Sequence, residues 1–131
     1  MRREQRGMSL SAFFAVVVLA LLLVAGLVVD GGAQAAAARR AELVAAAAAR
    51  AAADETATAR LAGAKPDLSA ALAAAERVLG EHEDVQSEVR FTAGRVQVTT
   101  ATGADTVFLS LIGIRRLEAK GAAEADLVSN R

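Results

Sequence analysis

The feature that most constrains this chain is an uncharged run from Ala12 to Val29, which follows three arginines at positions 2, 3 and 6. As an α-helix, these 18 residues extend roughly 27 Å, close to the ~30 Å hydrocarbon thickness of a bilayer. The run therefore predicts one membrane-spanning helix, with the lipid bilayer as a partner. The large side chains expected to anchor it are Phe13, Phe14, Leu19, Leu21, Leu22, Leu23 and Leu27.

The charges that precede this run set its expected orientation. Three arginines outnumber the lone Glu4, and basic residues beside a first hydrophobic segment tend to stay in the cytoplasm. We therefore expect residues 1–11 to be a cytoplasmic basic segment and residues 12–29 to cross the cell membrane as a single pass. The rest of the chain, including its C-terminal domain, is then extracytoplasmic.

Two other interpretations of the run remain open. A cleavable secretory signal also starts with basic residues, and Ala33-Gln34-Ala35 supplies the small residues that signal peptidase needs, which would release the chain after Ala35. The run is, however, longer than the apolar core of about 7 to 15 residues in such signals. The third interpretation is the core helix of a soluble domain, although little else in the chain is large enough to surround it.

Composition excludes several classes of site. The 131 residues include no cysteine, one histidine, and 15 acidic residues that balance 15 basic ones. Without cysteine there is no disulfide framework, thiol nucleophile or Cys-ligated metal. A formal net charge of zero gives no long-range attraction for nucleic acid. We expect no cofactor, no metal, no nucleic-acid partner and no small-molecule substrate.

Residues 30–63 form an alanine-rich segment with scattered arginines and acidic residues. Alanine has the highest helix propensity, so the segment should be helical with little tertiary support. Its shortage of large apolar side chains leaves two interpretations, a spacer or a small-residue surface for a partner helix. If Gly31 and Gly32 do not interrupt it, it continues the membrane helix as one rod.

Residues 64–131 are predicted to form a small α+β domain. Pro66 ends the preceding helix, and a second helix can begin with Asp67 or Ser69 near its N-terminus and run to Leu79, closed by Gly80. An apolar face at helical spacing predicts that this second helix covers a sheet. That face consists of Leu68, Leu72, Ala75 and Leu79.

The remaining segments show strand patterns. Residues 89–98 alternate apolar and polar around Ala93-Gly94 and predict a β-hairpin. A second turn is expected at residues 102–105, and the continuous apolar run from Val107 to Ile112 suits a central strand. A period of two from Leu117 to Leu127 favours a last strand, although the Ala, Glu and Lys content of this segment would also suit a helix. The expected fold class is α+β: a long N-terminal transmembrane or stalk helix, a second short helix, and a small antiparallel sheet of three or four strands.

Candidate catalytic groups are few. His82 lies in the acidic loop 81–84, but neighbouring loop residues point in different directions and no second histidine completes a common metal site. Arg115-Arg116 is more typical of a solvated strand end than of an anion site. No phosphate-binding glycine pattern or nucleophile elbow occurs. We therefore expect no catalytic residues and no enzymatic activity.

Four features follow one another in the N-terminal half: an arginine-rich start, a glycine before the apolar helix, Val-Val-Asp-Gly-Gly at 28–32, and Ala-Ala-Ala-Arg-Arg-Ala-Glu at 36–42. This order resembles the TadE/TadG-like proteins of high-GC Gram-positive bacteria over roughly residues 1–62. Those proteins are membrane-anchored, pilin-like accessory components of the tight-adherence, or Flp, pilus and secretion system. The resemblance implies a pilin-like fold, with other pilin-like subunits or Tad inner-membrane assembly proteins as partners.

The resemblance also implies a possible processing site. Processed members are cut after a glycine that precedes a helix with glutamate at the fifth mature position, followed by an aromatic residue. Gly7 matches the glycine, Met8 would become the first residue and Phe13 matches the aromatic, but Ala12 replaces the glutamate. That carboxylate is tolerated in the apolar layer where it pairs with a positive group such as the new amino terminus. Its loss argues against a main fibre subunit.

Together these features predict a non-enzymatic, single-pass membrane accessory, similar to a minor pilin, of a Tad or Flp pilus or a related secretion system. The alternative is a secreted envelope-binding module that signal peptidase releases after Ala35.

Overall fold

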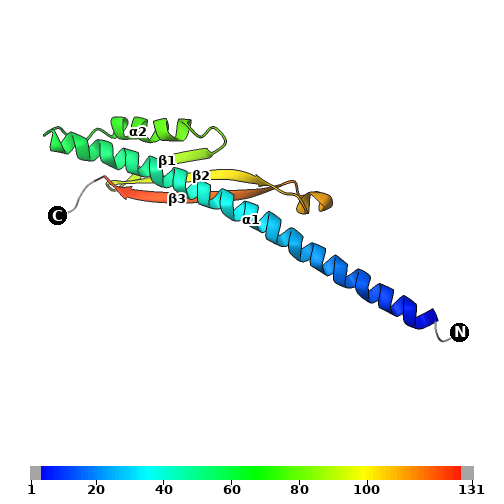
Figure 1. Cartoon of the computed structure of the whole chain (residues 1–131). Helices are drawn as coiled ribbons and strands as arrows, with labels where there is room; N and C mark the ends of the chain where they lie inside the picture. Colours follow the sequence, from blue (N-terminus) through cyan, green and yellow to red (C-terminus); the bar gives the residue numbers. More distant parts are fainter. Residues whose placement is uncertain (1–3, 128–131) are drawn as a thin grey trace.

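The computed structural model describes residues 4–127, with side chains described from Ser9 onward, and has an α+β architecture (Figure 1). Three strands form one antiparallel sheet in the order β1-β2-β3. This confirms the expected fold class, with three strands. In chain order the elements are helix α1 (Glu4–Leu61), helix α2 (Leu68–Gly80), strand β1 (Gln86–Thr92), strand β2 (Arg95–Asp105), 3-10 helix η1 (Leu109–Ile112) and strand β3 (Arg116–Asp126).

Helix α1 is continuous over 58 residues. Gly31 and Gly32 lie within it, because a helical glycine costs only about 1 kcal/mol and the alanines that follow favour the helix strongly. At about 1.5 Å per residue, α1 is roughly 87 Å long. The run predicted to cross the membrane and the alanine-rich segment therefore form one rod, which Figure 1 draws from blue to green.

The C-terminal half of α1 packs against one face of the sheet and against α2, and these parts together make up the head (residues 30–127). Valines of β2 and Leu79 of α2 complete the core. Of the two sequence interpretations of the alanine-rich segment, a spacer or a small-residue surface for a partner helix, the second describes its packing against α2, but neither anticipated its packing against the sheet. The buried side chains of α1 in this core are Ala41, Val44, Ala45, Ala48, Ala49 and Ala52.

Gly121 of β3 marks the closest approach of the sheet to α1. A Cβ atom at this position would lie 2.3 Å from the backbone nitrogen of Glu42 and 2.4 Å from the carbonyl carbon of Ala41. Its ladder partner Thr100 is buried and donates its hydroxyl to the carbonyl oxygen of Ala41 at 2.8 Å. A side-chain hydrogen bond thus supports the apolar contact at the point where strand and helix are nearest.

Helix α2 begins and ends where the sequence predicts. The carboxylate of Asp67 accepts hydrogen bonds from the hydroxyl of Ser69 at 2.7 Å and from its backbone N–H at 2.8 Å. The hydroxyl, and after it the backbone N–H, lowers the pKa of Asp67 from its ordinary value. The predicted apolar face is only partly buried, since Leu79 is covered and Leu68 is exposed. The buried residues of α2 are Ala71, Ala74, Ala75 and Leu79.

The strands confirm two predictions and correct two. The β1–β2 hairpin forms around Ala93 and Gly94, and the strand predicted at 117–127 is present as β3. The predicted turn at 102–105 is wrong, because β2 continues to Asp105 and pairs with β3 along its whole length. The predicted central strand at 107–112 is also wrong. Since β2 and β3 pair directly, residues 106–115 must reverse the chain, and they form the tip loop that contains η1.

Replacement of Gly121 by alanine should lower the free energy of unfolding by about 1 to 3 kcal/mol, because the added methyl group meets helix backbone that cannot move aside. Gly32→Ala is the matched control: a Cβ there meets nothing within 4 Å, and the change should stabilise α1 by up to about 1 kcal/mol. Denaturant unfolding of the full chain in detergent micelles measures both. Equal effects would contradict the close contact.

Candidate membrane anchor and the Asp30 contact

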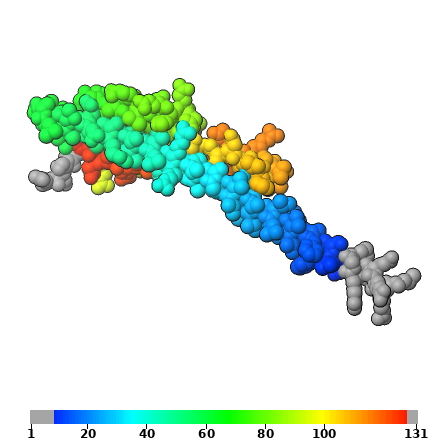
Figure 2. Space-filling view, in the orientation of Figure 1, coloured from blue at the N-terminus to red at the C-terminus, as the bar shows by residue number. Residues whose placement is uncertain are grey.

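The free part of α1 (residues 9–25) carries most of the predicted anchor. Within the described chain, only 6 % of the most apolar 18-residue window of this helix is buried, and Figure 2 shows it as a narrow rod projecting from the head. Contiguous apolar surface of this size marks a membrane or protein contact. The helix is compatible with a single membrane span. All predicted anchor residues are more than half exposed: Phe13, Phe14, Leu19, Leu21, Leu22, Leu23 and Leu27.

The side chain of Asp30 connects α1 to the tip loop at the end of this apolar run. Asp30 is 2 % exposed. Its carboxylate accepts backbone N–H hydrogen bonds from Val107 at 2.7 Å, Leu109 at 2.7 Å and Phe108 at 3.4 Å. The first N–H groups of a helix have no partner within the helix, and no local side chain caps η1. A carboxylate from α1 therefore caps η1 from a distance of more than 70 residues in sequence.

Gly26 provides a second contact one helical turn earlier, on the same side of α1 as Asp30. A Cβ atom at Gly26 would lie 2.8 Å from both Cβ and Cγ of Phe108. Only a residue without a side chain lets the phenylalanine lie this close to the helix. Asp30 and Gly26 together fix the tip loop on α1 next to the free part of the helix.

The other charged candidates do not converge on a site. His82 is partly buried beside α2, and Asp84 pairs with Arg40 of α1 at 2.9 Å. Arg116 lies over Gly103 and within 4.0 Å of Asp105, so it belongs to the paired ends of β2 and β3. Among the residues whose side chains are described, no group of three His, Cys, Asp or Glu lies close enough to hold a metal ion.

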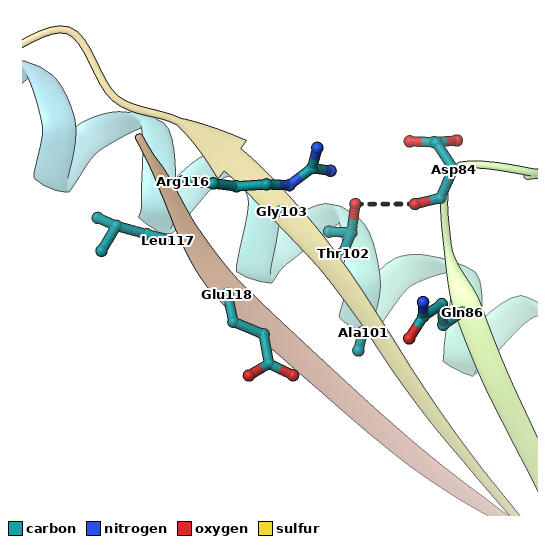
Figure 3. A pocket seen from close by; sticks show the side chains of 8 residues that line it. All are labelled: Asp84, Gln86, Ala101, Thr102, Gly103, Arg116, Leu117 and Glu118. Atoms are coloured by element: carbon teal, nitrogen blue, oxygen red, sulfur yellow. Dashed lines mark hydrogen bonds between the residues drawn. The ribbon is translucent and has the colours of Figure 1, made fainter. Parts of the chain in front are cut away.

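An open hollow of about 520 Å³ lies between the end of β2 and the loop before β1 (Figure 3). The one hydrogen bond drawn in Figure 3 runs from the Thr102 hydroxyl to the backbone carbonyl of Asp84 at 3.2 Å. The charged ends of Asp84, Arg116 and Glu118 point in different directions. The hollow therefore lacks the convergent polar groups that define a ligand site.

The sequence prediction at Gly7 and Met8 lies outside the residues whose side chains the structure describes, while Phe13 is exposed and contacts Phe14 with ring centroids 6.0 Å apart. No role for Asp30 or Gly26 is expected from the sequence, which places residue 30 only at the start of the alanine-rich segment. The sequence does contain one indication of this contact. Gly26 and Asp30 are four residues apart, so a carboxylate and a position without a side chain lie on the same face of the helix.

No family model, no curated protein and no solved structure matches this chain.

Replacement of Asp30 by alanine should speed hydrogen exchange at the backbone amides of Val107 and Leu109, because both lose their acceptor. Exchange at Val98, in the middle of β2, should not change. Asp54→Ala removes an exposed carboxylate from the same helix and serves as the control. Exchange is measured by NMR on the full chain in detergent micelles. Unchanged protection at 107 and 109 would show that Asp30 does not hold the loop.

Proposed function

We propose that this chain is a non-enzymatic, single-pass membrane accessory, similar to a minor pilin, of a Tad or Flp pilus or a related secretion system. Its N-terminus lies in the cytoplasm, the free part of α1 lies in the bilayer, and the head lies outside. Its mechanism is structural: α1 holds the head at a fixed position beside other pilin-like subunits or the inner-membrane assembly proteins.

One observation carries the membrane part of this proposal. The head covers α1 only from Gly26 onward, and the 17 residues before it expose an almost wholly apolar surface. In a protein dissolved in water, that surface would cost about 25 cal/mol for each exposed Å² of apolar area. A bilayer removes this cost along the whole length of the helix.

The pilus part rests on the order of features in the N-terminal half and on the architecture. A long helix whose first part is free and whose second part packs on a small antiparallel sheet is the fold that the resemblance implies. Ala12 in place of the family's glutamate favours an accessory role over that of the main fibre subunit.

The secreted alternative is disfavoured by the Asp30 contact. Cleavage after Ala35 would cut α1 within its continuous length and remove both Asp30 and Gly26 from the tip loop. Three backbone N–H groups would lose their acceptor and Phe108 would lose its packing surface. A module built to be released would not depend on residues upstream of the cut.

The double substitution L21R/L22R should prevent membrane insertion, because each arginine near the centre of a span costs about 2.5 to 3.5 kcal/mol. Membrane fractionation of the full chain in cells measures the effect. L61R/L68R adds the same charge at exposed leucines of the head and should leave the chain in the membrane fraction. Retention of L21R/L22R in membranes after carbonate washing would contradict the anchor.

The native N-terminus separates the proposal from its alternative. We expect mass spectrometry of the protein from its own cells to find a start at Met1, or at Met8 if a prepilin peptidase cuts after Gly7. A start at Ala36 would identify the secreted module and overturn the membrane assignment. Gly7→Leu is the matched variant, because it should abolish a Met8 start and leave an Ala36 start unchanged.

A further inference from the structure

The tip loop presents an apolar surface that the proposed function does not use. Residues 106–114 contain no charged side chain, and nothing in the described chain covers the outer side of the loop. Leu111 is 83 % exposed and Ile112 is 73 % exposed, the highest values of any large apolar residues in the head outside Leu61. The exposed apolar residues of the loop are Val107, Leu111, Ile112 and Ile114.

The loop holds this surface in a fixed shape. The backbone N–H of Thr106 donates to the carbonyl of Arg115 at 3.0 Å, and that of Ile114 donates to Leu109 at 3.0 Å. The Ser110 hydroxyl donates to the carbonyl of Val107, and the carboxylate of Asp30 caps η1. The loop is therefore closed on itself and tied to α1, with the side chains of Leu111, Ile112 and Ile114 exposed.

The position of the loop along α1 sets its depth relative to a bilayer. The uncharged part of α1 runs from Gly7 to Val29, which is 23 residues. A hydrocarbon core of ~30 Å takes about 20 of them. Wherever those 20 or so are placed between Arg6 and Asp30, Gly26 falls inside the hydrocarbon or at its edge. Phe108 lies directly against Gly26.

From this geometry we propose that the tip loop is a second membrane contact, inserted into the lipid layer on the head side of the bilayer. The proposal rests on the proposed function, because it needs the free part of α1 to span a membrane. Leu111 and Ile112 lie among the acyl chains just below the headgroups, and Phe108 seals the space between loop and helix. Figure 1 shows the loop as the part of the head nearest to the N-terminal end of α1.

Tilting of α1 does not lift the loop out of the lipid. A span tilted by about 20° moves a loop packed about 10 Å from its axis by roughly 3 Å along the membrane normal. Gly26 is about 6 Å nearer to the bilayer centre than Asp30, at about 1.5 Å per residue. The loop therefore stays at the interface or below it for ordinary tilts.

The charges at the neck of the loop fit the same placement. Arg115 follows the uncharged residues directly and is exposed, so its guanidinium group can reach lipid phosphates while its stem stays in the apolar layer. The guanidinium of Arg116 lies over Gly103 of β2, and the exposed carboxylate of Asp105 is 4.0 Å from it. The charged groups thus sit on the water side of the apolar residues, as at a membrane interface.

Single tryptophans test the depth, because the chain has none of its own. L111W reports on the tip loop, L19W on the span, and L61W on an exposed leucine at the far end of α1. Each full-length variant is inserted into vesicles of phosphatidylcholine and phosphatidylglycerol. Fluorescence is then quenched with phosphatidylcholine brominated near the top of its acyl chains, with the same lipid brominated near the chain ends, and with aqueous acrylamide. I112W provides a second probe of the loop.

We expect L111W and I112W to emit at shorter wavelength than L61W, to lose most acrylamide quenching and to be quenched most by the shallow brominated lipid. L19W should respond to the deep one. If L111W and I112W behave like L61W while L19W is quenched by lipid, the loop contact is wrong and the anchor stands. Shielding that appears only at high protein-to-lipid ratio means that a second copy covers the loop, which also overturns the proposal. Failure of L19W to meet lipid overturns the anchor itself.

Discussion

The close approach of β3 to the backbone of α1 is the contact on which the rest of the structure depends. A chain with few large side chains cannot build a deep core, so it gains packing by bringing elements very near to one another. Gly121 has no side chain and Ala41 has only a methyl group, so strand and helix can lie close together here. The Thr100 hydroxyl donates a hydrogen bond to the backbone carbonyl of Ala41 at the same point. With the sheet fixed on α1 at this point, β2 and β3 run along the helix and carry the tip loop to Asp30.

One helix therefore serves both the head and the proposed anchor. The helix continues through Gly31 and Gly32 without a break, so the orientation of the proposed span in a bilayer would also determine the orientation of the sheet. Two contacts hold the tip loop on α1 where the head and the proposed anchor meet. The Asp30 carboxylate accepts hydrogen bonds from the loop backbone, and one turn earlier Phe108 packs against Gly26. In the function that we propose, this connection would hold the head at a set height above the membrane.

The outer face of the sheet differs from the face on α1. It carries charged and polar pairs across the strands, among them Arg95 with Asp126 at 3.0 Å and Gln97 with Glu124 at 3.1 Å. Exposed pairs of this kind contribute little to stability, but they keep the outer face of the sheet polar and hydrated. Most of the large exposed apolar side chains of the described chain lie on α1 between Leu10 and Val29 and on the tip loop, the two places that we assign to lipid; the others are Leu43, Leu61 and Leu68.

The sequence by itself determined the long apolar helix, the α2 boundaries at Asp67 and Gly80, the first hairpin and the last strand, because periodicity, capping and turn residues act locally. It did not determine the use of the alanine face, since a stripe of small residues suits a spacer, a partner helix or a sheet equally well. Nor did it determine residues 107–112, whose apolar run has strand composition. Only the tertiary structure decided these, because the pairing of β2 with β3 forces the run to reverse, and a carboxylate on α1 caps the turn that results.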